Sequence, residues 1–375
     1  MNRDLPSTPK NDVAAASGRR WRTWGRRVLS LLVVLTLVYF LRNTLLGAWE
    51  QLHQLQADTN ARLDFRWGWC FGAAAIYVVG VLPAGWFWHR VLRDLGQKTS
   101  LARAMRAYII GHLGKYVPGK LWVVFLRVGL VAGPEVQPSM AAAAVFIETL
   151  TMMAVGAFLS AVYLVFAWQG HGQLLAAAVG TATVAVFFTL PPVFKPVLRI
   201  IARKSGREDV LRAVECLGFR TLWQGWLGMG LLWICFGISL WMTLRALGLG
   251  VPFWPSLPRM VAAAALATVS GFVIILLPGG LGVREFVLVA LLAPYLSNSL
   301  AAIVPAGRAD LTAVLAAGLL RVVWVMAEMA AALVAWFSVW PAIRSSHPSR
   351  SGNRSPSPAT FEDDAVHRVL PADLP

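Results

Sequence analysis

The fold class of this chain is decided by residues 139–167, SMAAAAVFIETLTMMAVGAFLSAVYLVFA, where Glu148 is the only charged residue. A helix needs about 20 consecutive, predominantly apolar residues to cross the hydrocarbon core of a bilayer. The stretch exceeds that length and contains no proline to interrupt it. It therefore predicts a transmembrane helix.

Similar apolar segments occur along the rest of the chain. They lie at about 28–49, 67–92, 173–192, 221–248, 257–277, 283–304 and 309–340. The 375 residues are 57% apolar and 14% charged, whereas soluble domains are nearer 45–50% and 25%. The sequence therefore predicts an all-α polytopic integral membrane protein with about eight transmembrane helices and no soluble catalytic domain.

The first of these segments has an alternative interpretation. Its strictly apolar part, residues 28–41, is short enough for a cleaved signal peptide. The long leader before it and the missing A-x-A cleavage site favour a retained span.

The net charge of +16 is distributed in a way that indicates a membrane and not nucleic acid. Basic residues gather at 19–27, 93–106 and 195–220, whereas the connections 168–172 and 249–256 contain no Lys, Arg, Asp or Glu, and neither does 295–307. Positive residues mark cytoplasmic loops. We therefore expect a multi-pass protein of the cytoplasmic (inner) membrane with both termini in the cytoplasm.

Three regions follow from this organisation. Residues 1–24 form a basic cytoplasmic N-terminus that we expect to be disordered, 25–341 form the membrane domain, and 342–375 form a disordered cytoplasmic tail rich in Ser and Pro.

Two short motifs interrupt the apolar pattern. An amphipathic helix, predicted at 101–113 to lie in the membrane interface, precedes GKYVPGK at 114–120 and an apolar run at 121–131. Eleven helical residues cover only about 16 Å, too little to cross, so a re-entrant segment is expected. The second motif is LPGGLGVRE at 277–285.

The two motifs align without gaps, VPGKL at 117–121 with LPGGL at 277–281. The alignment suggests an internal duplication of about four spans per half. The sequence leaves open whether the halves are parallel or inverted, and whether 283–304 spans fully or forms part of a hairpin.

Broken helices release backbone groups that hydrocarbon cannot satisfy, so they persist where protein or a wet cavity supplies partners. A freed helix N-terminus also attracts anions. We expect Lys115, Lys120 and Arg284 to contact a lipid phosphate and the acidic residues to hold the cations in place. The predicted headgroup site comprises Lys115, Tyr116, Pro118, Gly119, Lys120, Arg127, Glu148, Gly279, Gly280, Gly282, Arg284 and Glu285. Alternatively, the lysines extend to the surrounding lipid headgroups, and Arg284 and Glu285 form a local structural pair.

Other charges fall inside apolar segments. Placing a charge near the bilayer centre costs about 3 kcal/mol or more, so Glu148, Arg321 and Glu328 should face the interior and pair. Expected partners of Glu148 are Lys120, Arg127 or Arg321, either as part of the site or as a purely structural ion pair. His112 is expected to be an interfacial hydrogen bonder, in preference to a proton relay.

No sequence motif indicates an enzyme. The three cysteines form no CxxC, and the six histidines form no metal-binding spacing. Walker, GxSxG and Rossmann patterns are absent from the sequence. We therefore expect no catalytic residue, no metal and no cofactor.

The two motifs together, 114–120 and 278–285, resemble the lysylphosphatidylglycerol synthase transmembrane region, also called the flippase-like family, and the similarity covers roughly 25–340. The resemblance implies the movement of aminoacylated phospholipids or isoprenoid-linked lipids between leaflets. Some members are fused to a soluble aminoacyltransferase or glycosyltransferase. After Trp340 this chain has 35 residues, too few for such a domain, so synthase activity is not expected.

Three functions are considered. The first is a translocator of a phosphate-bearing lipid, whether anionic, aminoacylated or isoprenoid-linked. The second is a membrane enzyme with Glu148 or Glu285 as general base. The third is a non-transporting subunit that recruits a cytoplasmic synthase or transferase through its basic loop and tails. The sequence specifies neither the lipid, the direction and energy source of its movement, nor the oligomeric state.

Overall fold

The computed structural model describes residues 65–116, 121–167, 218–273, 282–299 and 308–338, together with Tyr39, Arg42 and Leu46. Within these residues every regular element is helical. The elements are α2 (Trp67–Asp94), α3 (Leu101–His112), the 3-10 helix η1 (Leu113–Tyr116), α4 (Leu121–Val131), α5 (Pro138–Ala167), α9 (Phe219–Ala246), α10 (Phe253–Val273), α11 (Val283–Ser299) and α12 (Ala309–Phe337). They belong to one compact unit that ends at Phe337.

Four of these helices, α2, α5, α9 and α12, are long and apolar enough to cross a membrane. They match the predicted spans at 67–92, 139–167, 221–248 and 309–340, so the chain is a multi-pass helical membrane protein. The predicted span at 28–49, apart from Tyr39, Arg42 and Leu46, lies outside the described residues, and so does the predicted span at 173–192. The predicted terminal segments 1–24 and 342–375 lie outside them as well.

The remaining two predicted spans differ from the structure. Helix α10 begins four residues before the predicted 257 and ends at Val273, and α11 has 17 residues; neither is among the four long apolar helices. Residues 274–281 and 300–307, which follow these two helices, lie outside the described residues.

Large apolar side chains cover much of the outer surface. Phe71 and Phe166 are each 75% exposed, Phe286 is 73% exposed and Leu227 is 58% exposed. Such side chains occur on all four of the long apolar helices. They are what lipid-facing helices present, since the surrounding hydrocarbon is equally apolar.

Helices α2 and α9 pack against each other in opposite directions along their length. At one end the Arg66 amide donates to the Ala246 carbonyl at 2.9 Å, and at the other Thr221 donates to Asp94. Near the middle, a side chain at Gly80 would have no room against α9. Small residues at such contacts let membrane helices approach closely.

The same two helices end in the same way. Each contains 28 residues, and each is followed by a glycine of positive φ, 77° at Gly96 and 80° at Gly248. The amides of these glycines donate to Arg93 and Arg245, at 3.0 and 3.1 Å. This is the glycine-terminated helix cap for which a left-handed residue is required.

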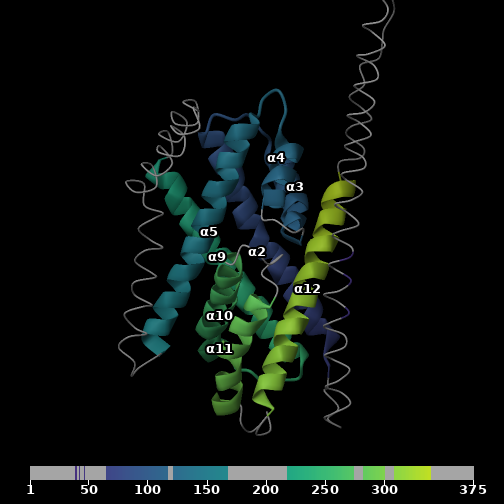
Figure 1. The fold of residues 1–375 in the computed structure, drawn as a ribbon, viewed down its shortest axis with the longest axis vertical. Helices are drawn as coiled ribbons and strands as arrows, with labels where there is room; N and C mark the ends of the chain where they lie inside the picture. Colours follow the sequence, from purple (N-terminus) through teal and green to yellow (C-terminus); the bar gives the residue numbers. More distant parts are fainter. Residues whose placement is uncertain are drawn as a thin grey trace, which may run out of the picture. The chain divides into compact units, whose positions relative to one another are not determined.

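A shift of 152 residues relates further elements. It carries the first residue of α2, 67, onto that of α9, 219, and the first residue of α3, 101, onto that of α10, 253. The packing partners correspond as well, because α3 packs on α4 and α12 while α10 packs on α11 and α5. In Figure 1, α3 and α4 lie in the upper half of the view and α10 and α11 in the lower half.

The helix predicted at 101–113 corresponds to α3, and its placement in the membrane interface stays a prediction. Helix α3 packs against α2, α4 and α12, and Tyr108 is only 1% exposed. The small residues Ala104, Ala107 and Gly111 make this close packing feasible, since a Cβ on Gly111 would lie 2.4 Å from the Arg127 side chain.

Candidate functional site

A cavity of about 230 Å³ lies among these helices, and we call it the central cavity. Every described helix contributes to its wall, including η1 and the first turn of α11. Most of the lining is apolar. The charged side chains that reach it are Lys115, Arg127, Glu148, Arg284 and Arg321.

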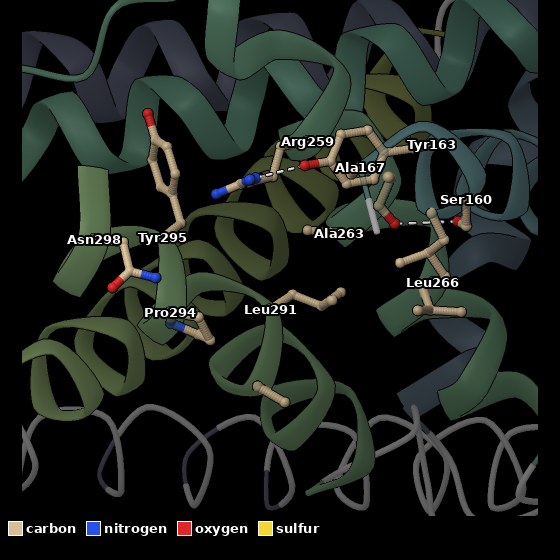
Figure 2. A pocket seen from close by; sticks show the side chains of 13 residues that line it. Ser160, Tyr163, Ala167, Arg259, Ala263, Leu266, Leu291, Pro294, Tyr295 and Asn298 are labelled. Atoms are coloured by element: carbon tan, nitrogen blue, oxygen red, sulfur yellow. Dashed lines mark hydrogen bonds between the residues drawn. The ribbon is translucent and has the colours of Figure 1, made fainter. Parts of the chain in front are cut away.

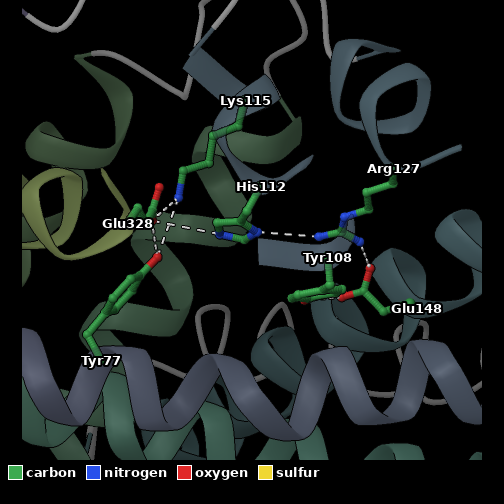
Figure 3. Close-up of polar contacts among 7 residues, drawn as sticks. All are labelled: Tyr77, Tyr108, His112, Lys115, Arg127, Glu148 and Glu328. Atoms are coloured by element: carbon green, nitrogen blue, oxygen red, sulfur yellow. Dashed lines mark hydrogen bonds and ion pairs between the residues drawn. The ribbon is translucent and has the colours of Figure 1, made fainter. Parts of the chain in front are cut away.

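Lys115 on η1 is held by a carboxylate from the last helix. Its Nζ lies 2.5 Å from Oε1 of Glu328, to which the Tyr77 hydroxyl also donates a hydrogen bond (Figure 3). The Glu328 side chain is 4% exposed, and its Oε2 has no hydrogen-bond partner among the described residues. A buried carboxylate thereby fixes the lysine at the cavity wall.

Arg127 on α4 pairs with Glu148 on α5. Its Nη1 donates to Oε2 at 2.7 Å, and both side chains are at most 3% exposed. Tyr108 donates to Oε1 of the same carboxylate at 2.8 Å, and its ring lies 3.8 Å beneath the guanidinium. One of the three partners expected for Glu148 is thus confirmed.

His112 lies between these two pairs (Figure 3). Nη2 of Arg127 is 3.3 Å from its Nδ1. A guanidinium can only donate, so Nδ1 is the acceptor and carries no proton. A neutral His112 therefore acts as a hydrogen-bonding spacer, with Nε2 3.8 Å from Glu328.

Arg321 on α12 pairs with Glu285 on the first turn of α11. The guanidinium donates to Oε1, and Oε2 accepts the amide of Gly282 at 2.8 Å. Gly282 has φ of 83°, so it begins α11 as a capping residue and its N–H is not available to a ligand. The local Arg284–Glu285 pair considered from the sequence is not formed.

Arg284 is the cation that differs from the others. Its guanidinium stacks 4.1 Å above the Trp324 ring, and no carboxylate of the described residues lies within ion-pair distance of it. The cations of the cavity are four and the carboxylates that pair with them are three, so the described part of the site carries one positive charge without a counter-charge. That arrangement can accept an anion.

The structure brings together five of the predicted site residues at the cavity wall, Lys115, Tyr116, Arg127, Glu148 and Arg284. Glu285 and Gly282 lie just behind it. The other five, Pro118, Gly119, Lys120, Gly279 and Gly280, lie outside the described residues.

Sequence reasoning missed two tyrosines, Tyr77 and Tyr108, and the aromatic partner Trp324. A phenol inside an apolar span needs a hydrogen-bond partner, and that signal could have drawn attention to Tyr77. Arg321 and Glu328 were recognised as buried charges, but without their partners. No group of three His, Cys, Asp or Glu side chains that could hold a metal occurs in the described ranges.

Comparison with known proteins adds one match. The family model described as the lysylphosphatidylglycerol synthase TM region matches residues 27–308 of the chain. No curated protein matches the chain.

Proposed function

We propose a lipid-handling function for this chain, which belongs to the lysylphosphatidylglycerol synthase TM region family. It binds a phosphate-bearing lipid, whether anionic, aminoacylated or isoprenoid-linked, with the headgroup in the central cavity. It then moves that lipid between the leaflets of the cytoplasmic membrane.

The observation that carries this proposal is the uncompensated guanidinium of Arg284. A charge without a partner is expensive inside a membrane, and a phosphate would supply the missing negative charge through bidentate hydrogen bonds. The rest of the wall is largely apolar, so it can accept the glycerol and upper acyl region of the same molecule. A cavity with both properties suits an amphiphile better than a free ion.

The arrangement of the helices supports translocation. We interpret α2–α5 and α9–α12 as duplicated halves, because a shift of 152 residues relates the starts of α2 and α3 to those of α9 and α10. Since α2 and α9 run in opposite directions, we take the proposed duplication to be inverted. Inverted repeats and broken helices that meet at a central site are the architecture of alternating access in transporters.

In this interpretation α3–α4 and α10–α11 are re-entrant hairpins that enter from opposite faces of the membrane. Each pairs with a long helix, α4 with α5 and α11 with α12. With the basic loops in the cytoplasm, α3–α4 enters from the cytoplasmic side and α10–α11 from the outer side.

The enzyme alternative has less support. The two carboxylates considered as general bases, Glu148 and Glu285, are each hydrogen-bonded to an arginine. A general base needs a carboxylate oxygen free to reach the substrate proton, and both carboxylates are already engaged by an arginine. The recruitment alternative depends on the basic loop at 195–220, whose residues before 218 the structure does not describe.

The proposal is tested by lipid movement in vesicles. Purified protein would be reconstituted into phosphatidylcholine vesicles that contain a fluorescent phosphatidylglycerol, and outer-leaflet fluorophore would be bleached with dithionite. We expect wild type to expose the inner-leaflet lipid and Arg284→Gln to slow this by at least about tenfold, because charge-assisted contacts are among the strongest hydrogen bonds.

The matched control is Arg245→Gln. Arg245 also stacks on aromatic rings, Trp69 at 5.3 Å and Trp241 at 5.9 Å, but it does not line the central cavity. This variant should retain wild-type rates. A monodisperse Arg284→Gln protein that moves lipid as fast as the control would remove the central cavity from the transport path.

A further inference from the structure

A second cavity, of about 340 Å³, lies at the other ends of α5, α10 and α11 (Figure 2). Its polar lining comes from all three helices: Tyr163 on α5, Arg259 on α10, and Tyr295 with Asn298 on α11. Leucine and alanine side chains, among them Leu266 and Leu291, make up most of the remaining wall.

Arg259 is held in this cavity by two aromatic residues. Its Nε donates to the Tyr163 hydroxyl at 2.6 Å, and its guanidinium carbon lies 4.5 Å from the centre of the Tyr295 ring. Figure 2 shows the guanidinium between these two side chains. The hydrogen bond and the stacked ring fix the plane of the guanidinium, so the side chain is positioned by protein contacts.

The charged end of Arg259 has no counter-charge. Among the residues that the structure describes, neither terminal nitrogen has a hydrogen-bond partner and no carboxylate lies within ion-pair distance. The same condition distinguishes Arg284 in the central cavity. A planar guanidinium with both terminal nitrogens unoccupied is suited to two oxygens of one phosphate.

The two cavities lie along the same helices. On α5, Met152 lines the central cavity and Tyr163 the second; eleven residues are three helical turns, so both lie on one face, about 16 Å apart. On α11, Arg284 and Tyr295 are related in the same way. The separation is roughly half of the hydrocarbon thickness of a bilayer.

We propose that Arg259, positioned by Tyr163 and Tyr295, is a second binding site for the phosphate group of the transported lipid, beyond the central cavity on its path across the membrane. This inference rests on the proposed function for the identity of the ligand. Headgroup and free inorganic phosphate share the same chemistry, and the test below separates them.

The experiment counts bound lipids by native mass spectrometry of the full chain in detergent, titrated with a short-chain phosphatidylglycerol. We expect two lipids on wild type, one on Arg259→Gln, one on Arg284→Gln and none on the double variant. The control Arg245→Gln should bind two lipids, because Arg245 lines neither cavity. Each substitution should weaken the affinity for lipid at its own site by at least about tenfold.

A milder variant guards against misfolding. Tyr163→Phe keeps the ring and removes only the hydroxyl that holds Arg259, so we expect about threefold to tenfold weaker binding of one lipid. If Arg259→Gln and Tyr163→Phe both bind two lipids with wild-type affinity, the second site does not exist. Millimolar inorganic phosphate that displaces this lipid alone would make the site one for a free anion and overturn its assignment to lipid.

The same measurement separates the two proposals. Two lipids on Arg284→Gln with one on Arg259→Gln would contradict the central headgroup site and leave the second site standing. One lipid on Arg284→Gln with two on Arg259→Gln would do the reverse.

Discussion

Both halves of the proposed repeat carry an ion pair between a short helix and a long one, with opposite polarity. In the first half the cation, Arg127, is on the short helix α4 and the carboxylate, Glu148, is on the long helix α5. In the second, the carboxylate, Glu285, is on the short helix α11 and the cation, Arg321, is on the long helix α12. Each pair joins a short helix to the long helix beside it.

Both pairs join an arginine to a glutamate, but they differ in how deeply they are buried. The first is almost completely buried, with side chains 3% and 2% exposed, and Tyr108 and His112 each add a hydrogen bond to it. The second is more open, with Glu285 27% exposed, and the unpaired Arg284 lies beside it. One half therefore holds its charges in a closed network, whereas the other leaves a cation for a ligand.

The largest effect should come from breaking the closed pair. Glu148→Ala leaves the Arg127 guanidinium buried without its counter-charge, and breaking a buried pair costs about 3–5 kcal/mol. We expect a strong fall in the melting temperature in detergent, measured by tryptophan fluorescence. The double variant Arg127→Met with Glu148→Leu removes both charges and should recover most of the loss. A single variant as stable as wild type would show that the pair is not structural.

A smaller effect is expected from the open pair. Glu285→Ala frees Arg321, which water at the cavity can partly solvate, and it removes the acceptor for the Gly282 amide at the start of α11. We expect a loss of about 2 kcal/mol, less than for Glu148→Ala, from the same measurement. Equal losses of stability in the two variants would mean that the two ion pairs are equally shielded from water.

Much of the scaffold was predictable from sequence, because a span of apolar residues is visible without knowing its neighbours. The pairing of Arg127 with Glu148 was among the partners expected, since few charges occur in those segments. The other two pairs were not expected. Lys115 and Glu328 are 213 residues apart in the chain, and Arg321 and Glu285 are 36 apart; their contact depends on how the hairpins pack against α12.

The hydrophobic periodicity of the sequence could not predict how these helices pack. In a membrane helix the lipid-facing and protein-facing sides are both apolar, so the usual amphipathic stripe is lost. Tyr77 illustrates the difficulty: it lies in an apolar run like other residues of α2, yet it is 1% exposed and bonded to Glu328. The proposed inversion of the repeat rests on the antiparallel contact between α2 and α9, which the apolar pattern alone did not predict.

The smallest expected effect comes from a comparison of two glycines that the proposed repeat places at equivalent positions. The shift of 152 residues places Gly85 of α2 on Gly237 of α9, and each is where its helix meets the following one. A Cβ at Gly237 would lie 2.7 Å from the backbone nitrogen and Cα of Val261, whereas at Gly85 it would meet first the sulfur of Met105, also at 2.7 Å.

The difference between these neighbours decides whether an added methyl group lowers the stability. Backbone cannot move aside without shifting α10, so Gly237→Ala should lose about 1 kcal/mol, the overpacking cost less the gain in helix propensity. The flexible end of Met105 can rotate away, so Gly85→Ala should be close to neutral. Thermal unfolding of the two variants side by side measures this, and a larger loss at Gly85 would contradict the packing described for the two halves. If Gly85→Ala is neutral and Gly237→Ala is destabilised, the two positions tolerate an added methyl group differently.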